Sequence, residues 1–131
     1  MSVVKPLRYL QNERIWLLST TPEVEWEIVV GGDSSAPSRA GVALVEQVLP
    51  QIDRLVAQAT RYLDEFVDRS RFAQGHEWFF VGLETGRHAA EPVRQFQLSF
   101  TNEGDIYGYW SVTFTETGRG LYPVRLSRRQ Y

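Results

Sequence analysis

The sequence predicts an α+β domain in which a twisted antiparallel sheet of about five to six strands packs on one long kinked helix, in the order β-β-α-β-β-β-β. Two periodicities predict it. Between about residues 39 and 68 apolar residues recur at alternating steps of four and three, which is the period of a helix with one buried face. On both sides of this stretch apolar and polar residues alternate, which is the period of half-buried strands.

Two strands are expected before the helix. Residues 15–18 form a short apolar run, and residues 23–28 alternate strictly, with carboxylates at Glu23, Glu25 and Glu27 and apolar side chains between them. Because successive side chains of a strand point to opposite faces, the three carboxylates are expected to share one face.

The helix is expected to begin after Ser38, whose hydroxyl is a suitable N-cap. Pro50 lies inside the helical pattern, and proline lacks the amide hydrogen that a helix interior requires. We therefore expect a kink at Pro50 or a short first helix that ends near Leu49. The expected apolar face consists of Val45, Leu49, Ile52, Val56, Ala59, Leu63 and Phe66.

Four strands are expected after the helix. Residues 76–83 are bulky and apolar on both faces, which is typical of a central strand covered on both sides. Residues 95–100 and 106–115 alternate around a turn at 102–105 and predict a hairpin, and residues 122–126 predict the last strand. In the hairpin, Ile106, Trp110, Val112 and Phe114 are expected to face the helix.

Length and composition limit the function classes. With 131 residues and 43% hydrophobic residues, residues 1–131 are expected to form one folded domain. The absence of cysteine excludes disulfides, thiolate metal sites and a cysteine nucleophile. A net charge of -2 argues against general nucleic-acid binding. No apolar stretch is long enough to span a membrane and no signal peptide is recognisable, so a cytoplasmic location is expected.

No catalytic, cofactor or metal motif is recognisable. The two histidines, His76 and His88, have no metal-binding spacing around them, and neither a nucleophile elbow nor a complete phosphate-binding loop occurs. We expect no catalytic residue, no cofactor and no metal. The row Glu23, Glu25 and Glu27 has three interpretations: an acid/base or cation site, a solvated strand face that discourages edge association, or a surface that pairs with arginines of a partner.

The polar face of the C-terminal hairpin is the better candidate for recognition. Tyr107 and Tyr109 are expected to share it with Arg125, and tyrosine and arginine are frequent in protein interfaces. The alternative is an ordinary solvated sheet face. The candidate partner-binding residues are Glu23, Glu25, Glu27, Tyr107, Tyr109 and Arg125.

The segments FQLSF at 96–100, NEGD at 102–105 and WSVTF at 110–114, with EWEI at 25–28 before a long helix, carry a resemblance. The layout resembles small bacterial α+β domains of unknown function, some of them similar to immunity proteins that neutralise the toxin of an interbacterial secretion system. Many such domains have a Gly-His pair where this chain has Gly108 and Tyr109. The resemblance implies a non-catalytic protein that occludes a cognate toxin, and it transfers no functional residue.

Three functions therefore stay open. The first is a cytoplasmic protein-binding domain that inhibits a partner. The second is a small-ligand-binding or enzymatic domain with a pocket between helix and sheet, lined by Trp16, Trp26 or Trp78 and polarised by His76 or a glutamate. The third is a structural homodimer that forms through an edge strand.

Overall fold

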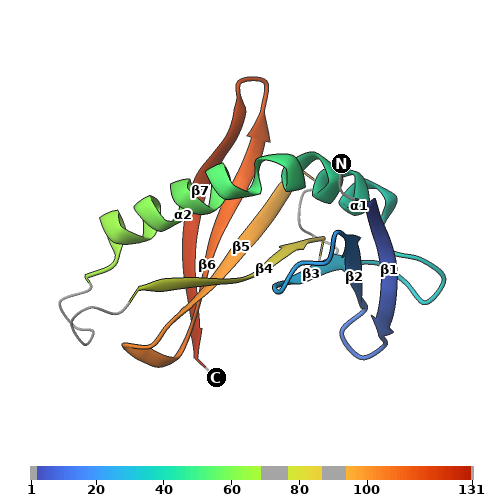
Figure 1. Cartoon of the computed structure of the whole chain (residues 1–131), viewed down its shortest axis with the longest axis horizontal. Coiled ribbons are helices and arrows are strands. Elements are labelled where there is room, and N and C mark those ends of the chain that lie inside the picture. The colour runs from blue at the N-terminus through green and yellow to red at the C-terminus, as the bar shows by residue number, and fades with distance from the viewer. Residues whose placement is uncertain (1–2, 69–76, 87–93, 131) are drawn as a thin grey trace.

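The computed structural model describes residues 3–68, 77–86 and 94–130. It contains one seven-stranded sheet and a long interrupted helix that crosses one face of that sheet (Figure 1). The strands are β1 (Val3–Leu10), β2 (Ile15–Thr21), β3 (Glu27–Gly31), β4 (Trp78–Thr85), β5 (Gln95–Asn102), β6 (Asp105–Thr117) and β7 (Gly120–Gln130). The α+β class is confirmed, with seven strands in place of the expected five to six.

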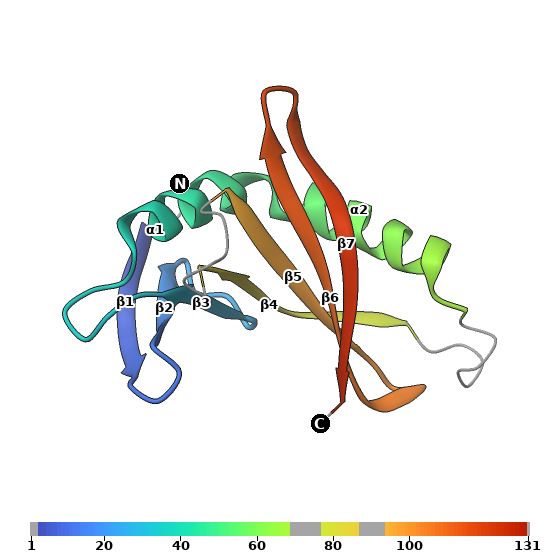
Figure 2. The same ribbon diagram turned by 180° about the vertical axis from the view of Figure 1, so that it is seen from behind.

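The strands lie in the sheet in chain order, from β1 at one edge to β7 at the other. Every neighbouring pair is antiparallel except β3 and β4, which are parallel. The helix connects these two strands, and a parallel pair needs such a crossover. Figures 1 and 2 show the strand directions turning steadily across the sheet, as the right-handed twist of strands requires.

Strand β1 is the element that the predicted order lacks, so the observed order is β-β-β-α-β-β-β-β. It pairs with β2 along its whole length, and the register shifts between Pro6 and Arg8. Lys5, Pro6, Leu7 and Arg8 are all exposed, so β1 shows no alternation of buried and exposed side chains. Proline is tolerated here because β1 is an edge strand, where one row of backbone amides needs no partner strand.

The strand predicted at 23–28 is wrong in its bounds. Strand β3 begins at Glu27, and residues 22–26 form an irregular loop. Glu23 and Glu25 therefore do not share a strand face with Glu27. The alternation is nevertheless seen in burial, because Val24 and Trp26 are half-buried and all three glutamates are exposed. Alternating burial occurs here without strand pairing, since β3 pairs with β2 only from Ile28 onward.

The kink predicted at Pro50 is confirmed. Helix α1 (Arg39–Val48) passes through a single 3-10 turn, η1 (Leu49–Gln51), into α2 (Ile52–Phe66). Pro50 lies in that turn, where its missing amide hydrogen breaks the helical ladder. The N-cap is confirmed as well, because Ser38 Oγ accepts a hydrogen bond from the Gly41 amide at 3.2 Å.

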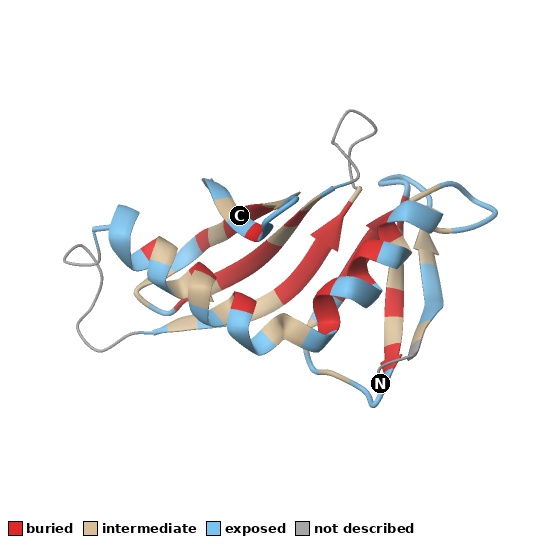
Figure 3. Ribbon diagram, turned by 90° about the horizontal axis from the view of Figure 1, so that it is seen from above, coloured by how far each residue is buried: buried red, intermediate tan, exposed pale blue. Residues whose placement is uncertain are grey.

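The core lies between the helix and the sheet (Figure 3). A continuous row of paired residues from β2 to β6, Leu18, Ile28, Leu83, Leu98 and Val112, points toward the helix and is buried. Phe96 and Phe114 stack with their ring centroids 5.1 Å apart. The rings of Trp26, Phe80 and Phe100 form a second aromatic cluster, with successive centroids 4.9 and 5.6 Å apart. Side chains therefore fill the space between helix and sheet over the described residues.

Three expectations about facing side chains are wrong. Ile106 is 68% exposed and does not face the helix, and Phe66 at the end of α2 is 61% exposed. Phe79 in the first half of β4 is 49% exposed, so this half of the strand is not covered on both sides. Each of these residues lies near the end of its element.

Candidate functional site

The face of the sheet opposite the helix has a graded composition. One continuous row of paired residues crosses it from β2 to β7, in the order Leu17, Val29, Glu84, Gln97, Thr113 and Arg125. The next row contains Glu27, Gly82, Ser99, Ser111 and Ser127. We call the side chains of these two rows, with Ile15, Tyr109 and Arg129, the open face. It changes from apolar and acidic on β2 to β4 to hydroxyl-rich on β5 and β6 and basic on β7.

Several side chains of the open face are buried although the described helix lies on the other face of the sheet (Figure 1). Ile15, Val29 and Glu84 are 2%, 6% and 8% exposed. In the middle of the face, the hydroxyls of Ser99 and Ser111 lie 3.3 Å apart, within hydrogen-bonding distance. The open face is therefore closely packed in its centre. The interpretation of the hairpin as an ordinary solvated sheet face applies only to the rim of the open face.

A hollow of about 240 Å³ lies on the acidic side of the open face. Tyr109 of β6 reaches it from one side, and Leu10 and Glu13 at the β1–β2 turn reach it from the other. Its remaining lining residues come from the paired strands between them: Ile15, Leu17, Glu27, Val29, Gly82, Leu83 and Glu84. Four stretches that are separated in the sequence (10–17, 27–29, 82–84 and residue 109) thus meet at one place, and they bring together the predicted site residues Glu27 and Tyr109.

The other predicted site residues lie elsewhere. Glu23 and Glu25 line a second hollow, also of about 240 Å³, between the loop at 22–26 and β2, and Glu27 lines both hollows. Tyr107 is 60% exposed, at the end of β6 nearest the β5–β6 turn. Arg125 pairs with Thr113, four residues along β6 from Tyr109 and so roughly 13 Å away. Tyr107 and Arg125 therefore do not belong to one contact point.

The arginine that contacts Tyr109 is Arg129, which the sequence reasoning missed. The two residues are paired between β6 and β7, and the Arg129 guanidinium carbon lies 5.0 Å from the Tyr109 ring centroid. A guanidinium over an aromatic ring is a favourable cation–π arrangement. The strand register determines this pairing, and the register follows from a bulge in the β6–β7 pair between Thr113 and Phe114 that no sequence pattern indicated.

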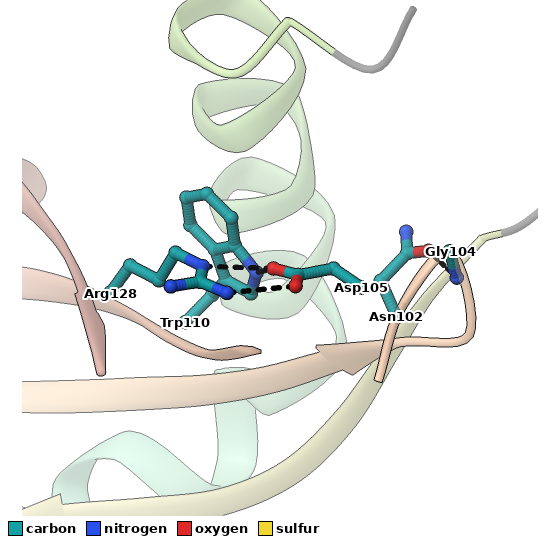
Figure 4. A network of polar contacts seen from close by, with 5 residues as sticks. All are labelled: Asn102, Gly104, Asp105, Trp110 and Arg128. Carbon is teal, nitrogen blue, oxygen red and sulfur yellow. Dashed lines mark hydrogen bonds and ion pairs between the residues drawn. The ribbon is translucent and has the colours of Figure 1, made fainter. Parts of the chain in front are cut away.

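A second polar cluster lies on the helix side of the sheet, at Asp105, Trp110 and Arg128 (Figure 4). Arg128 donates two hydrogen bonds to Asp105, at 2.9 Å from Nε and 2.8 Å from Nη2, and the Trp110 indole donates a third at 2.9 Å. The hydrogen bond from Arg128 lowers the pKa of Asp105, burial raises it, and the indole lowers it further. The net effect is a pKa below the ordinary value.

Gly108 leaves room for this cluster. A Cβ at Gly108 would collide with the Asp105 carboxylate and would lie 2.9 Å from the Trp110 indole nitrogen. Beside the cluster is a shallow groove of about 500 Å³, lined by Phe66, Val67, Asp68 and Leu126 together with the three cluster residues. The pair of Arg128 and Asp105 connects the start of β6 to the end of β7, and both residues line the groove.

The metal ligands and catalytic bases that the sequence offered were sought in the described residues. Across 3–68, 77–86 and 94–130, no three acidic or histidine side chains are arranged to hold a metal ion. His76 and His88, the candidate bases for a catalytic alternative, lie outside the described residues. The pocket expected between helix and sheet is occupied by the aromatic and aliphatic core, and Trp26 is part of that packing.

None of the described helices is both long enough and apolar enough to cross a membrane. In comparisons with known proteins, no family model, no curated protein and no solved structure matches this chain.

Proposed function

We propose that this chain is a non-catalytic cytoplasmic protein-binding domain that contacts its partner through the open face. The observation that supports the proposal most is the meeting of Glu27 and Tyr109 at a hollow on the sheet face opposite the described helix. An interface typically combines aromatic and apolar contacts with polar ones around them, and the hollow brings Tyr109 together with Leu17 and Val29 beside charged side chains.

The open face is acidic on one side and basic on the other, which favours a partner whose surface has the complementary charges. Glu13, Glu27 and Glu84 lie around the hollow. On β7, Arg129 contacts Tyr109 at the wall of the hollow, and Arg125 lies farther along the strand. Complementary charges accelerate encounter and fix the orientation of a partner. The resemblance noted in the sequence suggests that this partner is a toxin, which the domain would neutralise by occluding its working surface.

A homodimer formed through an edge strand is less favoured. Edge strand β1 contains Lys5 and Pro6 and a register shift, features that discourage pairing with another strand. Edge strand β7 contains Arg125, Arg128 and Arg129 and no acidic residue, so two copies of β7 would bring like charges together. We expect light scattering to give the monomer mass, and a dimer mass would favour the homodimer instead.

Co-purification from native lysate tests the proposal with matched variants. The variant is Glu27→Arg combined with Tyr109→Ala, and the control is Glu46→Arg, which reverses an exposed charge on α1. We expect one partner to co-purify with the wild type and the control and to be lost from the open-face variant, with all three proteins unfolding at similar temperatures. A partner retained by the open-face variant would show that another surface binds it.

A further inference from the structure

The two edges of the sheet differ in how well they could accept a further strand. Edge strand β1 contains Pro6, and its register with β2 shifts between Pro6 and Arg8. Edge strand β7 has 11 residues and pairs with β6 at every residue except Val124. Its one proline precedes this bulge, and residues 125–130 contain none. Within the part of the chain that the structure describes, residues 125–130 have a paired strand on one side only.

This edge has two arginines on one face without a carboxylate partner. Arg125 and Arg129 are exposed and share the open face, four residues and so roughly 13 Å apart. Arg129 contacts the Tyr109 ring, and neither arginine forms an ion pair with a described residue. Arg128 lies on the helix side and is paired with Asp105. Since β7 contains no acidic residue, both positive charges on the open face lack neutralisation within their own strand.

We propose that an extended segment of the partner protein pairs with β7 along residues 125–130 as an added strand, with two acidic side chains facing Arg125 and Arg129. The inference rests on the proposed function, because it takes the occupant to be a protein that lies on the open face, and it adds the chemistry of the contact segment. Main-chain hydrogen bonds to the edge supply affinity, and the two charges set the register. Positive charges on an edge deter pairing with a second copy of that edge and favour a strand of opposite charge.

The strand register specifies the rest of the segment. Residues two apart share a face of a strand, so the residue midway between the two acids lies opposite Ser127 on the open face, where a small polar side chain suits it. The residues on either side of it lie on the helix side, beside Leu126 and Arg128. Leu126 is half-buried and packs against the core, so an apolar neighbour extends that packing. The recognised pattern is acidic, apolar, small polar, any residue, acidic.

The test uses two acetylated and amidated peptides of identical composition in place of the partner's segment. Thr-Glu-Val-Ser-Val-Glu-Thr has its acids four residues apart and reads the same in both directions, so it fits parallel and antiparallel pairing. Thr-Glu-Val-Ser-Glu-Val-Thr has them three residues apart, on opposite faces of a strand. Each peptide is titrated into the full-length protein and followed by the chemical shifts and hydrogen exchange of amides 125–130.

We expect the first peptide to shift these amides and to slow the exchange of those that point away from β6. Because only one acid of the second peptide can face the open side, we expect it to bind about two- to fivefold more weakly. A third peptide, with the first sequence and N-methylated central amides, keeps the charges and loses the backbone donors. We expect it not to bind.

Arg125→Glu is the variant of choice because Arg125 is exposed and forms no ion pair with a described residue. Arg61→Glu, at an exposed position on α2, changes the net charge equally and is the matched control. Loss of the ion pair weakens binding of the first peptide by about two- to fivefold, and the new like-charge contact adds to this loss. Lysine in place of one peptide glutamate should restore binding to Arg125→Glu, and which replacement does so gives the strand direction.

Any of four results would overturn the inference: equal affinities of the two isomeric peptides, undiminished binding of the N-methylated peptide, equal affinities of the two variants, or no shifts at 125–130. Shifts of these amides with protein concentration alone would overturn it too, since the occupant would then be a second copy of the chain. None of these results affects the co-purification experiment, which uses no peptide. Conversely, peptide binding with no partner on the open face would remove the proposed function and keep the edge site.

Discussion

Thr113 and Thr85 are equally deep in the structure, each 1% exposed, but their hydroxyls have different surroundings. Thr85 Oγ1 donates a hydrogen bond to the Gln95 carbonyl at 2.6 Å. Thr113 Oγ1, in the centre of the open face, is buried and has no hydrogen-bond partner among the residues that the structure describes. Replacing each threonine with valine keeps the shape and removes the hydroxyl. The same substitution therefore removes a hydrogen-bonded hydroxyl at residue 85 and a hydroxyl without such a bond at residue 113.

The expected effects have opposite signs. A buried hydroxyl without a partner costs about 1–3 kcal/mol, so Thr113→Val should stabilise the fold by about 1 kcal/mol or more. Thr85→Val removes a hydrogen bond worth about 1 kcal/mol and should destabilise the fold by a similar amount. For a chain of 131 residues, each kcal/mol corresponds to a change of about 3–5 °C in unfolding temperature.

Urea unfolding followed by circular dichroism measures both free energies, and an unchanged slope against urea shows that the unfolded states are comparable. Thr85→Val is the matched control for Thr113→Val. If both variants lose stability by the same amount, the Thr113 hydroxyl is satisfied in solution and the reasoning fails. If Thr113→Val stabilises the fold, the open face contains a polar group that folding does not require.

Three further predictions concern the fold and its charges. Gly41→Ala should destabilise the protein by about 1–3 kcal/mol, because a Cβ at Gly41 would lie 2.6 Å from Val30 Cγ1; a gain of stability in thermal unfolding would contradict this close approach. Asp105→Asn should lower the unfolding temperature at neutral pH. Because the folded pKa of Asp105 is below 3.8, its contribution is present above that pH and is lost as the pH falls, so the difference from the wild type should shrink below about pH 4; a difference independent of pH would contradict it. Leu63→Ala should cost about 2–5 kcal/mol in urea unfolding, because Leu63 of α2 is fully buried in the core, and a loss below 1 kcal/mol would show that the helix packs loosely.

The helix was the most predictable element. Its period, its N-cap at Ser38 and its break at Pro50 each have a local cause, since capping and proline chemistry involve residues within one turn. The β5–β6 hairpin was predictable for the same reason: Asn102 Oδ1 accepts a hydrogen bond from the Gly104 amide at 2.8 Å within the turn.

Elements that depend on distant partners were harder to predict. Strand β1 has no alternation of apolar and polar residues from which it could be predicted. It forms because its backbone pairs with that of β2. Apolar and acidic residues alternate in the loop at 22–26 as they would in a strand, but this loop does not pair with β2. The spacing of apolar residues along the chain indicates which side chains are buried. Whether a segment pairs as a strand depends instead on the segment that lies beside it.

The candidate site shows the same division. Glu27 and Tyr109 were both predicted as contact residues, one from an acidic row and one from an aromatic pair, but nothing in the sequence placed them at one hollow. Arg129 was missed in favour of Arg125, because the β6–β7 bulge sets which arginine lies opposite Tyr109.

The amino-acid order alone determined the α+β class, the kinked helix and the apolar side of most strands, because these follow from spacing along the chain. Tertiary structure alone decided which strands meet, in what register and with how much twist. Those choices minimise the free energy of the whole packed sheet, and they brought four separate segments around one acidic hollow.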